Sequence, residues 1–149
     1  PGFRVRVALE STAGQGTYLG GELEHFPAVF GRVSEPERLR ACLDTCHLFV
    51  AGYDLRTPEA VRETLDRFET LVGFDRLCCV HANDAKAALG SHLDRHEHIG
   101  EGAIGEEGFR AFLNDPRLPY GLPVIVETPG AETEHGRNVA RLRALAGAA

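Results

Sequence analysis

The sequence predicts an α/β fold in which four strand–helix units follow one another along a single domain, residues 1–149. Short apolar runs rich in β-formers alternate four times with helix-sized segments, which is typical of parallel βα units. The runs are nearly continuous in apolar residues, as expected for strands that helices cover on at least one face. We therefore expect four parallel strands in sequential order, with helices on one face.

The strands are expected near 4–10, 40–44, 76–81 and 122–127. A helix is expected near 21–33, where Pro27 fits only in a first turn or at a kink. A second helix begins at the capping sequence Thr57-Pro58-Glu59 and ends at Gly73. A long polar loop runs from about 85 to 104. The last two helices are marked by apolar residues at helical spacing: Phe109, Phe112 and Leu113, then Val139, Leu142 and Leu145.

Composition indicates an ordinary globular protein, with 43% hydrophobic and 26% charged residues. The sequence contains no apolar run long enough to span a membrane and no signal-peptide pattern, so we expect a cytoplasmic protein. The net charge of −6 argues against binding nucleic acid through basic charge alone, unless bound cations offset the carboxylates. No CxxC pair is present, so reduced thiols are favoured over disulfides and a thiolate zinc site is not expected.

Each expected strand ends at a residue of a metal-ligand type: Glu10, Asp44, His81 and Glu127. A polar residue at a strand end is most often a solvated turn residue. Four such residues, all Asp, Glu or His, are harder to explain in that way. Sites in parallel α/β folds are built at the carboxyl ends of the strands. The pattern therefore predicts a shared metal site there.

Three further candidate ligands lie outside the strands. His47 follows Asp44 by three residues, and Asp94 and His96 lie in the segment LDRHEHIGEG of the long loop. Oxygen and nitrogen ligands without thiolates suit Zn²⁺, Mn²⁺ or Fe²⁺. Seven candidates exceed the needs of one tetrahedral ion, so we expect a cluster. Ions about 4 Å apart can clamp a phosphate oxygen and activate water, which points to phosphoester hydrolysis.

The remaining polar residues carry weaker signals. Arg95, Lys86 and Asn83 are candidate substrate contacts. The glycine-rich segment 10–21 has neither GxGxxG nor Walker spacing, so a flexible loop explains it at least as well as a phosphate site. The other histidines are expected to be surface or helix residues, with His98 as a neighbour of the ligands at most: His25, His92, His98 and His135.

Five blocks of the sequence resemble the endonuclease IV family of metal-dependent apurinic/apyrimidinic endonucleases. They are LESTAGQGTYLG, CLDTCHLFVAGYDLRTP, HANDAK, LDRHEHIGEGAIG and PVIVETP, and they follow one another over essentially the whole chain. The resemblance implies a (βα)₈ TIM barrel of the xylose-isomerase-like class, of which this chain would be the C-terminal half with about four βα units. It also implies double-stranded DNA with abasic sites as substrate.

The resemblance implies three zinc ions in the family. Glu10 would bridge two of them, and Asp44, His81 and Glu127 would complete one of that pair. His47, Asp94 and His96 would hold the third ion. The reaction implied is hydrolysis of the phosphodiester 5′ of an abasic site and removal of 3′ blocking groups. Glu127 would orient the attacking water or act as base, so Glu127 and Glu10 are the catalytic candidates.

The family takes two more histidine ligands from an N-terminal half that this sequence lacks, so about two ions are expected here. An eight-stranded barrel typically needs about 250 residues. Pairing with such a half and self-association both remain open, because a half-barrel leaves sheet edges exposed. Two other functions also stay open. One is a metal-dependent sugar isomerase or epimerase of the xylose-isomerase-like class, and the other is a non-catalytic metal-binding fragment.

Overall fold

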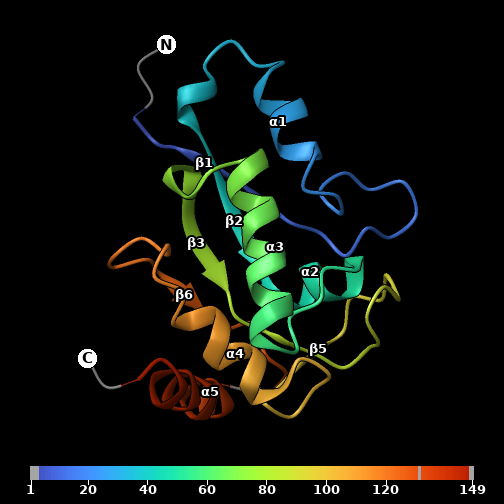
Figure 1. Ribbon diagram of the computed structural model, residues 1–149, viewed down its shortest axis with the longest axis vertical. Helices are drawn as coiled ribbons and strands as arrows, with labels where there is room; N and C mark the ends of the chain where they lie inside the picture. Colours follow the sequence, from blue (N-terminus) through green and yellow to red (C-terminus); the bar gives the residue numbers. More distant parts are fainter. Residues whose placement is uncertain (1–3, 131, 148–149) are drawn as a thin grey trace.

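The computed structural model describes residues 4–130 and 132–147. Its centre is a sheet of β1 (Val7–Glu10), β2 (Leu39–Asp44), β3 (Leu77–His81) and β6 (Val124–Ile125). The strands lie in the order β1-β2-β3-β6, and every neighbouring pair is parallel (Figure 1). The expected sequential parallel strands are therefore confirmed.

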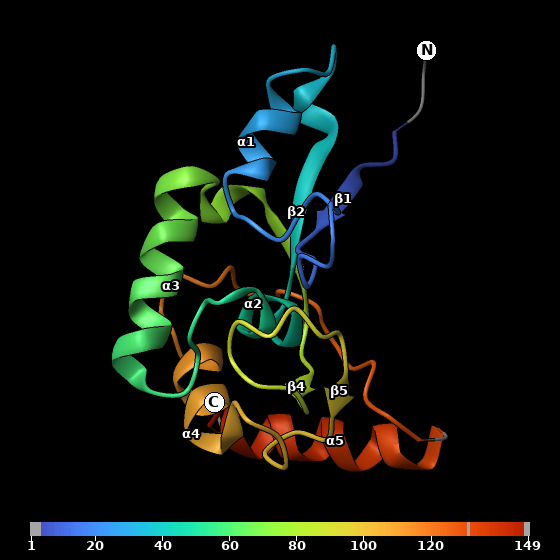
Figure 2. The ribbon, with the colours of Figure 1, turned by 90° about the vertical axis from the view of Figure 1, so that its right-hand side faces the viewer.

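The helices follow the strands in the expected alternation. Among the described residues they are α1 (His25–Phe30), α2 (Thr45–Ala51), α3 (Pro58–Leu71), α4 (Gly105–Leu113) and α5 (Glu132–Leu145), with 3₁₀ turns at Pro36–Arg38 and Phe74–Arg76. Figure 2 shows α1, α3 and α4 on the same side of β2. Helix α3 packs on α4, and α4 packs on α5. This succession places neighbouring helices beside one another over one face of the sheet.

The core lies between the sheet and the helices. Leu43 of β2 and Val80 of β3 are fully buried there, in the same cluster as Phe68 of α3 and Phe109 of α4. Burying one such side chain stabilises the fold by about 1.5–3 kcal/mol. Successive strand residues point to opposite faces, so the residues that alternate with this core layer project from the other face of the sheet. That alternation brings Asp44 and His81 to the face opposite the core.

Helix α2 and a small antiparallel pair were not expected from the sequence. Helix α2 starts immediately after β2 because Asp44 also serves as its N-cap, accepting a hydrogen bond of 2.9 Å from the His47 backbone N–H. In the segment expected to be an irregular loop, β4 (Asp84–Ala85) pairs with β5 (His96–Glu97). This pairing makes His96 part of a strand rather than of a free loop.

The two outer strands are shorter than expected. Strand β6 covers only Val124–Ile125, so Glu127 lies two residues beyond the strand end rather than at it. Its backbone N–H donates to the side chain of Asn83 instead of to a neighbouring strand. Val7, Val124 and Ile125 are exposed on β1 and β6, as expected for a sheet whose outer strands have no further neighbour among the described residues. No described helix is long and apolar enough to cross a membrane.

Candidate metal centre

Four side chains converge at the carboxyl end of the sheet: Glu10, Asp44, His81 and Glu127. One ligand atom of each lies within 4.8 Å of the corresponding atoms of the others. This separation is close to two metal–ligand bonds of about 2.0–2.2 Å each. The sheet register produces the convergence, because Asp44 lies opposite His81 and β1 ends at Glu10. The expected convergence on one point is confirmed.

His81 occupies the centre of this strand-end group. Its Nδ1 atom lies 3.0 Å from Glu10 Oε1 and 3.3 Å from Glu127 Oε2. A neutral imidazole can donate only one hydrogen bond from that nitrogen, so it cannot satisfy both carboxylates at full strength. Carboxylate oxygens and an imidazole nitrogen are ligand types that a divalent cation such as Zn²⁺ accepts, so this grouping fits a cation.

A second group lies beside the first and consists of His47, Asp94 and His96. The Nε2 atom of His47 lies 3.3 Å from Asp94 Oδ2, and the Nε2 atom of His96 lies 3.3 Å from Asp94 Oδ1. The ligand atoms of all three residues lie within 4.8 Å of one another. Helix α2 carries His47 and the loop around β5 carries the other two, so the structure brings together the three residues expected to share an ion.

Backbone carbonyls fix the tautomer that each histidine of this second group adopts when its ring is neutral. The Nδ1 atom of His47 lies 2.8 Å from the Ser11 carbonyl oxygen, and that of His96 lies 3.1 Å from the Glu127 carbonyl oxygen. A carbonyl only accepts, so each neutral ring carries its proton on Nδ1 and keeps a lone pair on Nε2. Both Nε2 atoms are buried without a hydrogen-bond partner among the residues that the structure describes. Metal-binding histidines are held in this way, so these residues fit a cation.

The site gathers several carboxylates around its histidines, and this shifts the pKa values of both kinds of group. Burial raises the pKa of Asp44, whose side chain is fully buried. His47, whose Nδ1 atom lies 3.4 Å from Glu10 Oε1, lowers the pKa of Glu10. Burial lowers the pKa of His47, but Glu10, Asp44 and Asp94 outweigh it and raise that pKa to about 9. The proton on His47 supplies part of the positive charge that a bound cation would supply. A metal ion would therefore compete with this proton for His47.

Asn83 connects two residues of the strand-end group, Asp44 and Glu127. Its amide Nδ2 donates to Asp44 Oδ2 at 2.7 Å, and its Oδ1 accepts from the Glu127 backbone N–H at 2.8 Å. The side chain is fully buried. That Asn83 contacts substrate stays a prediction; from its hydrogen bonds we propose that it positions the Asp44 carboxylate and the Glu127 backbone. In the sequence, the position of Asn83 between His81 and Asp84 was the sign that it lies close to the site.

Asp84 shapes the loop that carries Asp94 and His96. Its fully buried carboxylate accepts backbone N–H bonds of 2.8–3.3 Å from five residues, namely Ala85, Gly100, Gly102, Ile104 and Gly105. A Cβ atom on Gly102 would lie 2.5 Å from Asp84 Oδ1, so only glycine fits this approach. Sequence reasoning missed Asp84. The closely spaced glycines at 100, 102 and 105 could have indicated a loop whose backbone N–H groups gather around one acceptor.

The exposed cations Arg95 and Lys86 lie beside the second group. The Lys86 N–H donates to the Arg95 carbonyl oxygen at 2.9 Å, and the Arg95 guanidinium donates to the Asp94 carbonyl oxygen at 2.6 Å. The Cys46 thiol neighbours Asp44 and His96, and burial raises its pKa to about 12. The remaining histidines have hydrogen-bond partners outside both groups: His25, His92, His98 and His135.

The sequence matches a family model described as xylose isomerase-like TIM barrel over residues 3–145. The chain belongs to this family. The parallel sheet, its sequential order and the helices on one face are the family's architecture, in which this chain supplies about half. The expected TIM-barrel class is therefore confirmed.

The similar proteins reported next are called endonuclease 4 or endonuclease IV. The chain is 49% identical to the probable endonuclease 4 of Chloroflexus aurantiacus over 146 residues, which cover 97% of this chain and 51% of that protein. It is 48% identical to the probable endonuclease 4 of Haloarcula marismortui, covering 96% and 51% of the two chains. The crystal structure of endonuclease IV from Thermus thermophilus aligns with a TM-score of 0.81 and 39% identity, covering 96% and 51%. The chain thus spans about half the length of the relatives it matches.

Proposed function

We propose that this chain carries the main metal-binding part of a DNA-repair endonuclease that hydrolyses the phosphodiester 5′ of abasic sites and removes 3′ blocking groups. The observation that carries the proposal is the pair of adjacent ligand groups at one end of the sheet. A multi-ion centre suits phosphodiester hydrolysis, where two oxygens of an in-line displacement need stabilisation. The similarity to proteins called endonuclease 4 supports the same reaction.

Zn²⁺ fits the oxygen and nitrogen ligands of both groups, and Mn²⁺ or Fe²⁺ would accept them too. When bound, the ions would lower the pKa of a water molecule and polarise the phosphate. Glu10, Asp44, His81 and Glu127 would hold one ion, and the second group would hold another. We therefore propose about two ions for this chain, against three for the whole protein that the resemblance implies.

Glu127 is proposed as the residue that orients the attacking water and takes its proton. Its carboxylate is 46% exposed, so water and substrate can reach it. Its backbone is held on both sides, by Asn83 at the N–H and by His96 at the carbonyl oxygen. Glu10 is proposed to hold the ions in place from β1. Arg95 and Lys86, both exposed beside the site, are proposed to contact DNA phosphates.

The two alternative functions are a sugar isomerase and a non-catalytic metal-binding fragment. They differ from the endonuclease in whether they need His47, Asp94 and His96 or show turnover. A sugar isomerase of the same family needs the strand-end carboxylates and histidine, but not His47, Asp94 and His96. The Nε2 atoms of both histidines are buried and find no hydrogen-bond partner in the described part of the chain, and this favours the endonuclease. A non-catalytic metal-binding fragment would show both ions and no turnover.

The test is incubation of the zinc-loaded chain with a labelled duplex that contains one abasic site. We expect incision 5′ of that site, leaving a 3′-hydroxyl, and loss of incision with a chelator. Glu127→Gln should lower the rate at least about 100-fold if Glu127 moves the proton. Glu101→Gln is the matched control, because Glu101 pairs with Arg137 away from the centre. Ketose–aldose interconversion by the same preparation would support the isomerase instead.

A further inference from the structure

The face of the sheet that carries the metal ligands also carries a row of cysteines one step back along the strands. Cys42 precedes Asp44 by two residues on β2, and Cys79 precedes His81 by two on β3. Residues two apart on a strand share a face and lie roughly 7 Å apart. The register pairs Cys42 with Cys79 in the same way as it pairs Asp44 with His81.

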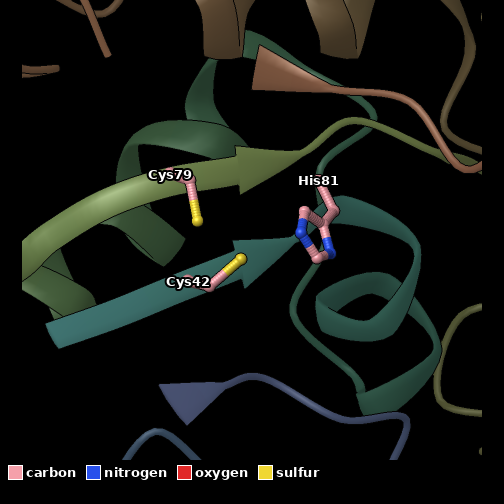
Figure 3. A group of neighbouring side chains, drawn as sticks. All are labelled: Cys42, Cys79 and His81. Atoms are coloured by element: carbon pink, nitrogen blue, oxygen red, sulfur yellow. The ribbon is translucent and has the colours of Figure 1, made fainter. Parts of the chain in front are cut away.

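The side chains of this row meet. The thiol sulfurs of Cys42 and Cys79 and a ring nitrogen of His81 all lie within 4.8 Å of one another. Figure 3 shows the two thiols directed toward each other across neighbouring strands, with the His81 ring at the strand ends. The separation is close to twice a zinc–sulfur bond of about 2.3 Å, so one ion could bridge these atoms after a small adjustment.

We propose that Cys42, Cys79 and His81 form a second kind of metal site, which takes a thiophilic divalent cation such as Cd²⁺. This site is distinct in chemistry from the carboxylate and histidine groups, because two of its three ligands are soft sulfur donors. Spacing along the sequence gave no sign of it, since the two cysteines come from different strands. The proposal departs from the sequence-based expectation of no thiolate zinc site, which rested on the absence of a CxxC pair.

Charge balance suits a divalent cation. On binding, two S–H bonds break, two metal–sulfur bonds form, and two protons leave to solvent, so one 2+ ion offsets two thiolates. The carboxylates of Glu10 and Asp44 add negative charge nearby, because Glu10 lies opposite Cys42 in the sheet. Cys79 is only partly buried, which gives an ion access to the pair from the uncovered face.

The third cysteine of the region is placed to serve as a control. A register shift between β2 and β3 leaves Cys78 as an extra residue opposite the Ala41–Cys42 step. Its sulfur consequently lies 3.9 Å from that of Cys79, although adjacent strand residues normally face opposite ways. Cys78 is not part of the group that joins Cys42, Cys79 and His81.

His81 belongs to both this thiol group and the strand-end group. An ion held by the thiols would therefore compete for a ligand with an ion held by Glu10, Asp44 and Glu127. This shared residue predicts that a thiophilic cation displaces an ion from the strand-end group without occupying the same position. The consequence is measurable as release of zinc, independently of any catalytic activity.

The experiment is titration of the reduced, zinc-loaded chain with Cd²⁺ under anaerobic conditions, following the ultraviolet sulfur-to-cadmium charge-transfer band. The band should saturate at one equivalent of Cd²⁺, and about one equivalent of zinc should appear on a chromophoric chelator. Cys42→Ser and Cys79→Ser should each remove about half of the band or more, and the double variant should remove all of it. Cys78→Ser and Cys46→Ser should keep both the band and the zinc release.

Circular dichroism identifies variants that fail to fold, and Cys42→Ala and Cys79→Ala replace any serine variant that does. No band in the parent chain would overturn the proposal. So would a band that survives in the folded Cys42/Cys79 double variant, or one that Cys46→Ser alone removes. A cadmium-113 resonance typical of two sulfur ligands in the parent chain, absent from the double variant, would support it.

Discussion

The imidazole rings of His47 and His96 lie 5.4 Å apart between centroids, and each turns its Nε2 atom toward Asp94. Within residues 4–130 and 132–147, neither nitrogen has a hydrogen-bond partner, although both are buried. An unpaired buried polar atom is costly, so two in contact with one carboxylate need an explanation. A cation held by these three residues would satisfy both at once, which makes this pair the strongest structural sign of a metal site.

Substitution of His96 should remove one ion. We expect metal analysis to give about two zinc ions per folded chain, and about one in His96→Ala, because the second group loses a ligand. His98→Ala is the matched control, since His98 lies in the same segment but contacts Asn138 instead. Full metal content in a folded His96→Ala variant would show that His96 is not a ligand.

The stability of the metal-free chain should fall as the pH rises through about 9. The pKa of His47 is raised from 6.5 to about 9 in the folded chain. The stabilisation is therefore fully present below pH 6.5 and is lost as the pH passes through the folded pKa. The loss should reach about 3 kcal/mol in urea unfolding. His47→Gln should lack this component, and an identical pH profile for the two proteins would contradict it.

Added zinc should change that profile, because a metal ion and a proton compete for His47. We expect zinc to bind more tightly as the pH rises through about 9, with release of a proton on binding. Isothermal titration calorimetry in two buffers of different ionisation enthalpy measures the protons released. Zinc affinity that does not depend on pH over this range would mean that His47 stays outside the site.

Removal of the Asn83 amide should weaken the centre without removing a ligand. In Asn83→Ala the Asp44 carboxylate and the Glu127 N–H both lose a buried partner, which should cost about 2 kcal/mol of stability. Zinc affinity should fall about 10- to 100-fold, as it does when a group that orients ligands is lost. A variant with reduced stability and unchanged zinc affinity would limit Asn83 to a structural role.

Asp84→Asn should loosen the ligand loop. The amide NH₂ of asparagine would face backbone N–H groups that now donate to a carboxylate oxygen, so we expect a loss of about 3 kcal/mol. Occupancy of the second group should fall with it, since Asp94 and His96 are carried by that loop. Glu101→Gln, on the same loop but paired with Arg137 at the surface, should leave both quantities unchanged.

The sheet and the convergence of the strand-end side chains could be predicted from the sequence because both follow from local patterns. Apolar runs mark β1, β2 and β3, and parallel strands bring their final residues to one edge. Helix α2 was not predicted, because Asp44 acts as strand end, N-cap and candidate ligand at once, and a single pattern reveals only one of these roles.

Contacts between distant segments could not be predicted in this way. The hydrogen bonds of Asp84 to Gly100 and Gly102 depend on a loop that returns to its own start. The contact between Cys42 and Cys79 depends on the pairing register of β2 and β3 and on the register shift between them. Neither can be read from the sequence of one strand alone. Residues that act through a partner far along the chain therefore become visible only in three dimensions.

The measurement that tests the central claim most directly is binding of the chain to a duplex with one abasic site, compared with an undamaged duplex, before and after chelation. The chain has a net charge of −6, so its own side chains give little general attraction for DNA. We predict that the metal-loaded chain prefers the abasic duplex and that chelation abolishes this binding. Strong, salt-sensitive binding to both duplexes that survives chelation would contradict a metal-dependent endonuclease site.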